Sequence, residues 1–143
     1  MKNRNQAAST LADLELFGDC SRRELAKVDS LFTQVTIPAG KVLIKEGRLG
    51  SEFLIIASGQ ADVTKSTGHG ISKVAELHGG EFVGEIALLN GVPRTATVTA
   101  VTDVTAYVSN AAEFREILRS APTVAQRIAE ASSFRSQDLA VAA

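Results

Sequence analysis

Both ends of the chain carry apolar residues three or four positions apart, the spacing that places them on one face of a helix. Near the amino end, Ser21 and Glu24 have the spacing of a capping box, in which each side chain accepts the other residue's backbone N–H. Near the carboxyl end, Asn110 and Glu113 repeat this spacing, and Pro122 suits the first turn of a further helix. The sequence therefore predicts three helices. Their apolar positions are Leu25, Val28, Leu31 and Phe32 in the first, Phe114, Ile117 and Leu118 in the second, and Val124, Ile128, Ala131 and Phe134 in the last.

The middle of the chain has the pattern of β structure. All glycines except Gly18 lie between residues 40 and 91, and glycine marks turns. Between the turns run short segments rich in Val, Ile and Thr, which fit a pleated surface. This pattern predicts a mainly β fold, an antiparallel jelly-roll-like β-barrel with flanking helices. The expected strands are 33–37, 41–44, 53–58, 60–65, 71–77, about 95–101 and 104–109.

Composition narrows the class of protein. A chain of 143 residues has the length of one domain, and its net charge of −1 gives no broad basic field to attract nucleic acid. The longest strongly apolar run, 53–57, is far too short to insert into a membrane. The amino terminus lacks the apolar stretch of a secretory signal, and one cysteine, Cys20, fits a reducing compartment. We therefore expect a cytoplasmic protein, complete or part of a longer one.

The stretch GEIALLNGVPRTAT, residues 84–97, raises a chemical question. Glu85 and Arg94 lie among residues that prefer burial, and a buried charge is costly unless it has a partner. The two could form a structural ion pair. Alternatively, a small phosphorylated sugar would satisfy both, because an arginine binds phosphate and a carboxylate accepts sugar hydroxyls. A glycine such as Gly84 lets a ligand approach backbone N–H groups closely.

This stretch closely resembles the phosphate-binding cassette of cyclic nucleotide-binding domains, as found in protein kinase regulatory subunits, nucleotide-gated channels and bacterial catabolite activators. The resemblance continues through residues 37–40, Gly47, 53–56 and Gly59, and covers roughly residues 14–135. It implies a double-stranded β-helix with amino-terminal helices and carboxyl-terminal lid helices. It also implies an amino-terminal extension at 1–13, the binding domain at 14–135 and the end of the lid helix at 136–143.

The resemblance assigns roles to individual positions. Glu85 resembles the acceptor for the ribose 2′-hydroxyl, and Arg94 resembles the phosphate clamp. Thr95 matches a position whose hydroxyl contacts the phosphate or a guanine amino group, although an ordinary strand threonine explains it as well. The remaining assignments are Gly84, Ile86 and Ala87 along the phosphate, Ala96 within the cassette, Val74 and Val83 as apolar walls for the purine, and Phe134 and Arg135 as a candidate lid or, equally, a core contact and a solvated charge.

These assignments predict a sensor with no catalysis of its own, in which the carboxyl-terminal helix moves when cyclic AMP, or alternatively cyclic GMP, binds. It needs no cofactor, and it would regulate an effector domain or protein. One alternative is a domain of this fold that has lost its ligand and serves as a protein interface. Another is a metalloenzyme of the cupin type, which is disfavoured because His69 and His78 cannot alone supply three or four ligands.

Overall fold

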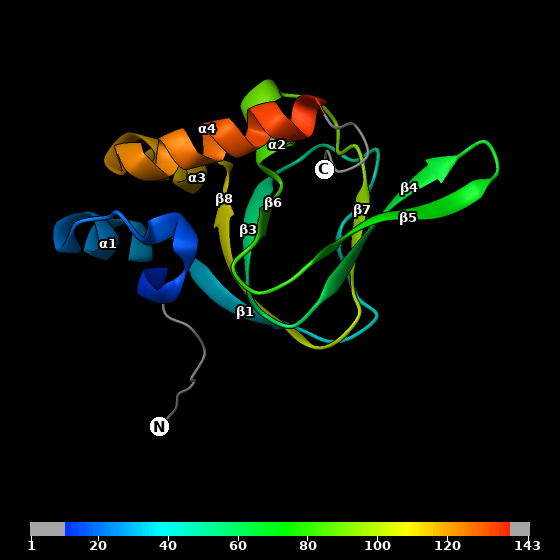
Figure 1. Ribbon diagram of the computed structural model, residues 1–143, viewed down its shortest axis with the longest axis horizontal. Helices are drawn as coiled ribbons and strands as arrows, with labels where there is room; N and C mark the ends of the chain where they lie inside the picture. Colours follow the sequence, from blue (N-terminus) through cyan, green and yellow to red (C-terminus); the bar gives the residue numbers. More distant parts are fainter. Residues whose placement is uncertain (1–10, 138–143) are drawn as a thin grey trace.

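The computed structural model describes the backbone of residues 11–137 and the side chains of residues 11–133. Helices precede and follow a central β region along the chain, and α1, α3 and α4 lie together on one side of the strands (Figure 1). The helical elements are η2 (Leu11–Asp13), η3 (Glu15–Phe17), α1 (Arg22–Asp29), α2 (Glu85–Asn90), α3 (Ala111–Ser120) and α4 (Pro122–Gln137). The strands are β1 (Thr33–Ile37), β2 (Val42–Ile44), β3 (Glu52–Ser58), β4 (Ala61–Thr67), β5 (Gly70–Leu77), β6 (Phe82–Val83), β7 (Thr97–Ala100) and β8 (Val104–Asn110).

The strands form two four-stranded antiparallel sheets, in the orders β1-β8-β3-β6 and β2-β7-β4-β5. This architecture confirms the predicted mainly β fold with flanking helices. The two sheets face each other without closing into a continuous barrel, so the fold is a jelly-roll-like sandwich. In Figure 1 the β4–β5 hairpin extends away from the rest of the domain, and α4 runs across one end of the sheets with α2 beside it.

Strand β3 explains why the chain contains an uninterrupted apolar run. Phe53 and Ile55 face the helices, whereas Leu54 and Ile56 face the space between the two sheets. All four are almost completely buried. Alternating side chains of a strand point to opposite faces, so a strand covered on both faces needs apolar residues at every position. The helices are thus bound to the sandwich through one face of β3.

Both predicted capping boxes are confirmed. The Glu24 N–H donates to Ser21 Oγ over 3.1 Å and the Ser21 N–H donates to Glu24 Oε1 over 2.8 Å. Asn110 and Glu113 make the equivalent pair of bonds at the start of α3. Pro122 is the first residue of α4, as predicted. Each cap satisfies backbone donors that the first helical turn leaves without partners.

Several boundaries differ from the prediction. Helix α1 ends at Asp29, so Leu31 and Phe32 lie beyond it; the Phe32 ring instead packs against Phe17, Phe53 and Tyr107. Strand β7 begins at Thr97 rather than near residue 95. The sequence did not indicate β6, a strand of two residues paired with β3, or the short helices η2 and η3. These elements depend on tertiary packing and carry little local pattern.

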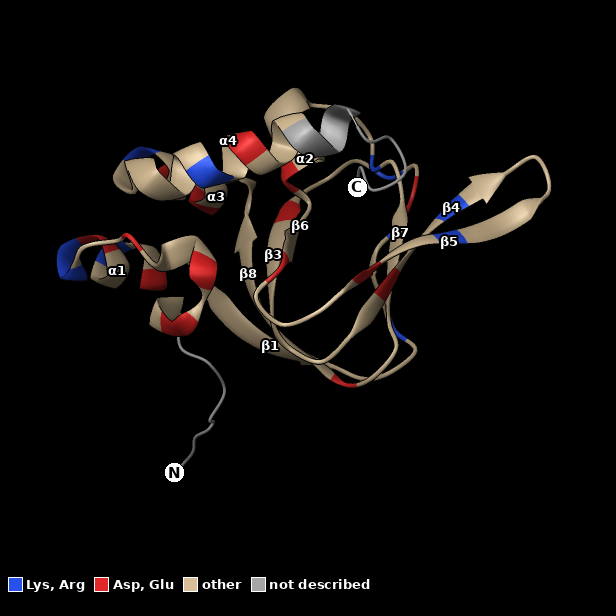
Figure 2. Cartoon of the chain, in the orientation of Figure 1, with Lys and Arg blue, Asp and Glu red and all other residues tan. Residues whose placement is uncertain are grey.

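The amino-terminal segment is fastened to α4. The Arg127 guanidinium donates hydrogen bonds to the backbone carbonyl of Glu15 and to the Asp19 carboxylate. Positive and negative residues are distributed over helices and strands alike in Figure 2. No helix within the described part of the chain is long and apolar enough to cross a membrane.

The turn between β3 and β4 should be the glycine position least tolerant of a side chain. Gly59 has φ +97°, and an added Cβ would overlap the Asp103 carbonyl oxygen and lie 3.0 Å from Val104 Cα. Gly40 has a similar φ of +89° but open space around it. We expect Gly40→Ala to lower the free energy of unfolding by about 1–2 kcal/mol, the cost of the left-handed backbone. Gly59→Ala should lose a further ~1–3 kcal/mol from overpacking. Urea unfolding of both variants measures the difference, and equal losses would contradict the clash.

Candidate functional site

The position just before α2 accommodates only glycine. Gly84 precedes the helix with φ +102°, and an added Cβ would lie 2.8 Å from the Glu52 carbonyl oxygen and 2.9 Å from Arg94 Nη1. The next residue, Glu85, is fully buried, and Ile86 and Ala87 are buried beside it. Removing a carboxylate from water costs free energy, so a carboxylate at this position requires hydrogen bonds or a charged partner to be tolerated.

Arg94 is the second buried charge, with 6% of its surface exposed. Its Nη1 donates to the Gly84 carbonyl over 2.9 Å and its Nη2 donates to the Glu52 carbonyl over 2.6 Å. Burial lowers the pKa of Arg94, and the nearby carboxylates of Glu52 and Glu85 act in the opposite direction. The guanidinium remains charged at physiological pH, because an arginine pKa is far above it.

Arg94 has two hydrogen-bond partners that the sequence did not indicate. The sequence suggested that a ligand, or an ion pair with Glu85, would satisfy this charge. In the structure the guanidinium donates to two backbone carbonyls. One belongs to Gly84, just before α2, and the other to Glu52, at the start of β3. Backbone carbonyls bind the guanidinium without neutralising it, so its positive charge remains available to an anion.

The turn between β2 and β3 holds Arg94 by its own backbone as well. The Gly47 N–H donates to the Arg94 carbonyl over 2.9 Å, and the Arg94 N–H donates to the Arg48 carbonyl over 2.7 Å. Gly50, in the same segment, is packed so closely that an added Cβ would lie 2.9 Å from Arg94 Cζ and 2.7 Å from Ala87 Cβ. Side chain and backbone of Arg94 are therefore fixed by residues more than 40 positions earlier in the chain.

The sequence did not identify Gly47, Gly50 or Glu52 as part of the site. Glu52 contributes its backbone carbonyl, a group that every residue type possesses, so its identity carries no signal. The only hint for Gly50 is its place in a turn with two glycines before an apolar strand. The contact of these residues with Arg94 becomes visible only when the fold joins the two segments.

The apolar residues that were expected to line the purine lie between the two sheets. Val83 on β6, Ala96 before β7 and Val74 on β5 belong to one cluster between the sheets, in which Val83 and Ala96 are buried and Val74 is half-buried. Thr95, which lies between Arg94 and Ala96 in the chain, is half-buried. The structure thus brings polar groups and apolar walls to the same end of the sandwich. The side chains of Phe134 and Arg135 lie outside the described residues, so their assignment as a lid stays a prediction.

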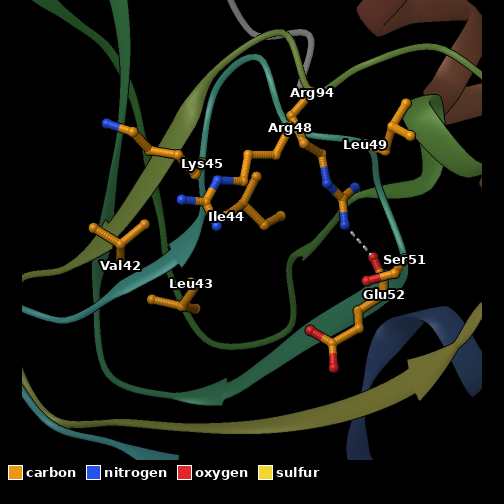
Figure 3. Close-up of a pocket in the computed structure, with 9 residues that line it drawn as sticks. All are labelled: Val42, Leu43, Ile44, Lys45, Arg48, Leu49, Ser51, Glu52 and Arg94. Carbon is orange, nitrogen blue, oxygen red and sulfur yellow. Dashed lines mark hydrogen bonds between the residues drawn. The ribbon is translucent and has the colours of Figure 1, made fainter.

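A cavity of about 430 Å³ opens on another side of Arg94 (Figure 3). It is bounded by β2, the turn that follows β2, and the first residues of β3. Its lining residues are Val42, Leu43, Ile44, Lys45, Arg48, Leu49, Ser51, Glu52 and Arg94.

The two histidines do not meet. His69 lies exposed in the turn of the β4–β5 hairpin, and His78 follows β5, where its ring lies 3.3 Å from the Glu76 carboxylate. Among the described residues no three His, Cys, Asp or Glu side chains come together as metal ligands would.

The family model of the cyclic nucleotide-binding domain matches residues 34–121 of this chain. This match covers more than half of the sequence, from the second residue of β1 to just beyond the end of α3. The chain belongs to this family. The resemblance expected from the cassette GEIALLNGVPRTAT is thereby confirmed.

Individual relatives agree with this assignment. The cAMP-dependent protein kinase regulatory subunit of Yarrowia lipolytica is 47% identical to this cyclic nucleotide-binding domain over 92 residues, which are 64% of the chain and 22% of the relative. The acetyltransferase Pat of Mycolicibacterium smegmatis is 35% identical over 111 residues, 78% of the chain and 33% of the relative. The regulatory domain of Toxoplasma gondii protein kinase A, solved with cAMP, has a TM-score of 0.75 and 26% identity, over 86% of this chain and 47% of that one.

The cyclic nucleotide-binding domain spans a third or less of these two curated relatives. It therefore matches only part of each relative, and the activities of the whole relatives are not assigned to this chain. One relative is a regulatory subunit and another carries an acetyltransferase. The expectation that this chain has no catalysis of its own stays a prediction.

Substitution of Gly50 should test how tightly Arg94 is held. Gly50→Ala needs no left-handed backbone, so its cost comes from the contacts of the new methyl group with Ala87 and Arg94. Neither can move freely, since one is a methyl on α2 and the other is buried and hydrogen-bonded. We expect the free energy of unfolding to fall by about 1–3 kcal/mol.

Gly68→Ala is the matched control, because Gly68 has open space around it and no positive φ. Its free energy of unfolding should stay within about 0.5 kcal/mol of the parent. The guanidino Hε resonance of Arg94 in NMR spectra should move in Gly50→Ala and stay in place in Gly68→Ala. Two variants with equal stability and unmoved Arg94 resonances would contradict the packing described for Gly50.

Proposed function

We propose that this domain binds a cyclic nucleotide, with its phosphate against Arg94 and the start of α2. The observation that carries the proposal is the buried, charged guanidinium of Arg94, whose hydrogen-bond acceptors are neutral carbonyls that do not compensate its charge. Placing a charge in a site shielded from water is costly, and an anion that enters recovers part of this cost through a strong charge-assisted bond.

The neighbouring residues suit the rest of such a ligand. The backbone N–H groups at Ile86 and Ala87, in the first turn of α2, supplement the arginine as phosphate donors. Glu85 would accept a hydrogen bond from the ribose hydroxyl, at a distance from the phosphate that avoids repulsion. Val74, Val83 and Ala96 supply apolar surface for the purine. A hydroxyl at Thr95 would contact the phosphate or the base.

Cyclic AMP is the ligand that we propose. Its support comes from the relatives: the Yarrowia lipolytica protein is a cAMP-dependent protein kinase regulatory subunit, and the Toxoplasma gondii domain was solved with cAMP. By the same comparison, the partner of this domain would be an effector domain or protein whose activity the nucleotide controls.

Helix α4 is proposed to report occupancy of the site. It packs against α2, whose first residues form the phosphate cradle, and against η3 at the amino-terminal end. A ligand that binds the backbone N–H groups in the first turn of α2 therefore contacts a helix that packs directly against α4. The response requires that nucleotide binds one arrangement of α4 more tightly than another, because a ligand shifts an equilibrium only by its difference in affinity.

Calorimetric titration of the purified chain with cyclic AMP and cyclic GMP tests the proposal, with Arg94 as the critical residue. We expect one site per chain and tighter binding of cyclic AMP. Arg94→Ala should weaken binding by about 2–5 kcal/mol, because the phosphate loses a shielded charged partner. Arg94→Lys keeps the charge but not the planar fork, so it should bind with intermediate affinity.

Arg115→Ala removes an exposed arginine on α3 and should leave the affinity unchanged. Thermal unfolding of each variant without ligand separates loss of binding from loss of fold, since Arg94 also binds two carbonyls. A folded Arg94→Ala variant with the parent's affinity would sink the proposal, as would the absence of heat with both nucleotides at millimolar concentration.

Truncation tests the role of α4. Removal of residues 132–143 should leave a folded domain, because the buried α4 residues Val124 and Ile128 precede the cut. We expect faster release of a fluorescent cyclic nucleotide in stopped-flow measurements, since closing of a helix over a ligand slows dissociation more than it speeds association. Removal of residues 138–143 alone is the control. If both truncated chains release the nucleotide at the parent's rate, the end of α4 does not report occupancy.

A further inference from the structure

The cavity beside β2 gathers more positive charge than it neutralises. Lys45, Arg48 and Arg94 line it together with one carboxylate, that of Glu52, so three positive charges face one negative charge. In Figure 3 the Glu52 side chain leads away from the Arg94 guanidinium, whose hydrogen bond goes to the Glu52 backbone carbonyl. No ion pair among the described residues involves Lys45 or Arg48.

Backbone hydrogen bonds join the turn that carries Lys45 and Arg48 to Arg94. The Arg48 N–H donates to the Lys45 carbonyl over 3.2 Å, which closes the turn that carries both residues. The same turn exchanges two backbone hydrogen bonds with Arg94, one through Gly47 and one through Arg48. Lys45 and Arg48 therefore stand on a turn whose backbone is joined directly to that of Arg94. Three positive groups around one cavity with a single carboxylate in its lining repel one another, and an anion that binds between them relieves this repulsion.

The walls of the cavity are partly apolar. Val42 and Leu49 are exposed large apolar side chains, with 46% and 79% of their surface accessible, and Ile44 forms a buried part of the lining. Ser51 adds a hydroxyl. This cavity is distinct from the proposed nucleotide cradle, because none of Gly84, Glu85, Ile86 and Ala87 lines it; the two share only Arg94.

We propose that this cavity is a second anion site, which takes a small molecule with a phosphate group on an apolar or aromatic body. Arg48 and Lys45 bind the phosphate, and the exposed Val42 and Leu49 contact the body. An arginine and a lysine suit a phosphate, because a guanidinium group donates paired hydrogen bonds to its oxygens and an ammonium group adds a further charge-assisted donor. The cavity volume of about 430 Å³ leaves room for more than the phosphate alone. This site does not depend on the proposed nucleotide binding.

Titration with phenyl phosphate and with inorganic phosphate, followed by NMR of the full chain, tests the proposal. We expect phenyl phosphate to shift the backbone resonances of residues 42–52 and to bind several-fold more tightly than inorganic phosphate, because only the ester contacts Val42 and Leu49. The double variant Lys45→Gln/Arg48→Gln should lose at least tenfold in affinity for both. Its melting temperature should stay close to the parent's, since no side-chain hydrogen bond to another described residue is lost.

Arg115→Gln is the control for a general loss of positive charge, and it should bind both probes as the parent does. The titrations are repeated with cyclic AMP at saturation, where the second site should still take phenyl phosphate. Binding that the double variant retains, or that cyclic AMP abolishes, would place the probe in the nucleotide cradle and overturn the proposal. So would the absence of shifts at residues 42–52. If cyclic AMP does not bind at all, the proposed function fails, and the double variant and its control still decide the second site.

Discussion

The burial of the Arg94 guanidinium is the constraint on which the rest of the site depends. A charge removed from water is tolerated only where good hydrogen bonds replace its hydration, and here two backbone carbonyls do so. One carbonyl belongs to Gly84, before α2, and the other to Glu52, at the start of β3. The arginine therefore joins its own segment, which contains Gly84, to the start of β3, which is distant in sequence. The surrounding residues must leave space for its planar group. Gly50 and Gly84 meet this demand because a Cβ at either position would collide with it.

The sequence predicted the parts of the fold that have local causes. The two capping boxes lie within four residues each, and the uninterrupted apolar run of β3 reflects that this strand is covered on both faces. Phe32 was assigned to a helix because its spacing fits one, but packing against Phe53 and Tyr107 requires the chain to leave the helix at Asp29. In the same way, β6 has only two residues and exists because β3 offers it a pairing edge.

In the candidate site, too, the sequence identified residues that are neighbours in the chain and missed those that only the fold brings together. The segment from Gly84 to Arg94 was identified from sequence because its residues are neighbours in the chain and their types are unusual for a buried stretch. The contribution of Glu52 was invisible, since a backbone carbonyl leaves no trace in residue identity. The sequence carried no signal for the exposed Lys45 and Arg48 either, because lysine and arginine on a surface turn are ordinary. Their significance comes from the fold, which places them with Arg94 around one cavity.

The hydrogen-bonding capacity of Arg94 explains how one side chain can serve structure and ligand together. A guanidinium has five N–H groups, and two of them donate to Gly84 and Glu52, which leaves three without such a bond to the described residues. A phosphate can therefore bind Arg94 without breaking the bonds that hold it. An arginine that had to release a structural partner would lose part of the binding energy to that exchange, and the cradle would loosen as the ligand entered. Here the same two bonds that make burial of the charge tolerable also keep its remaining donors in position, so the cradle is organised before any ligand arrives.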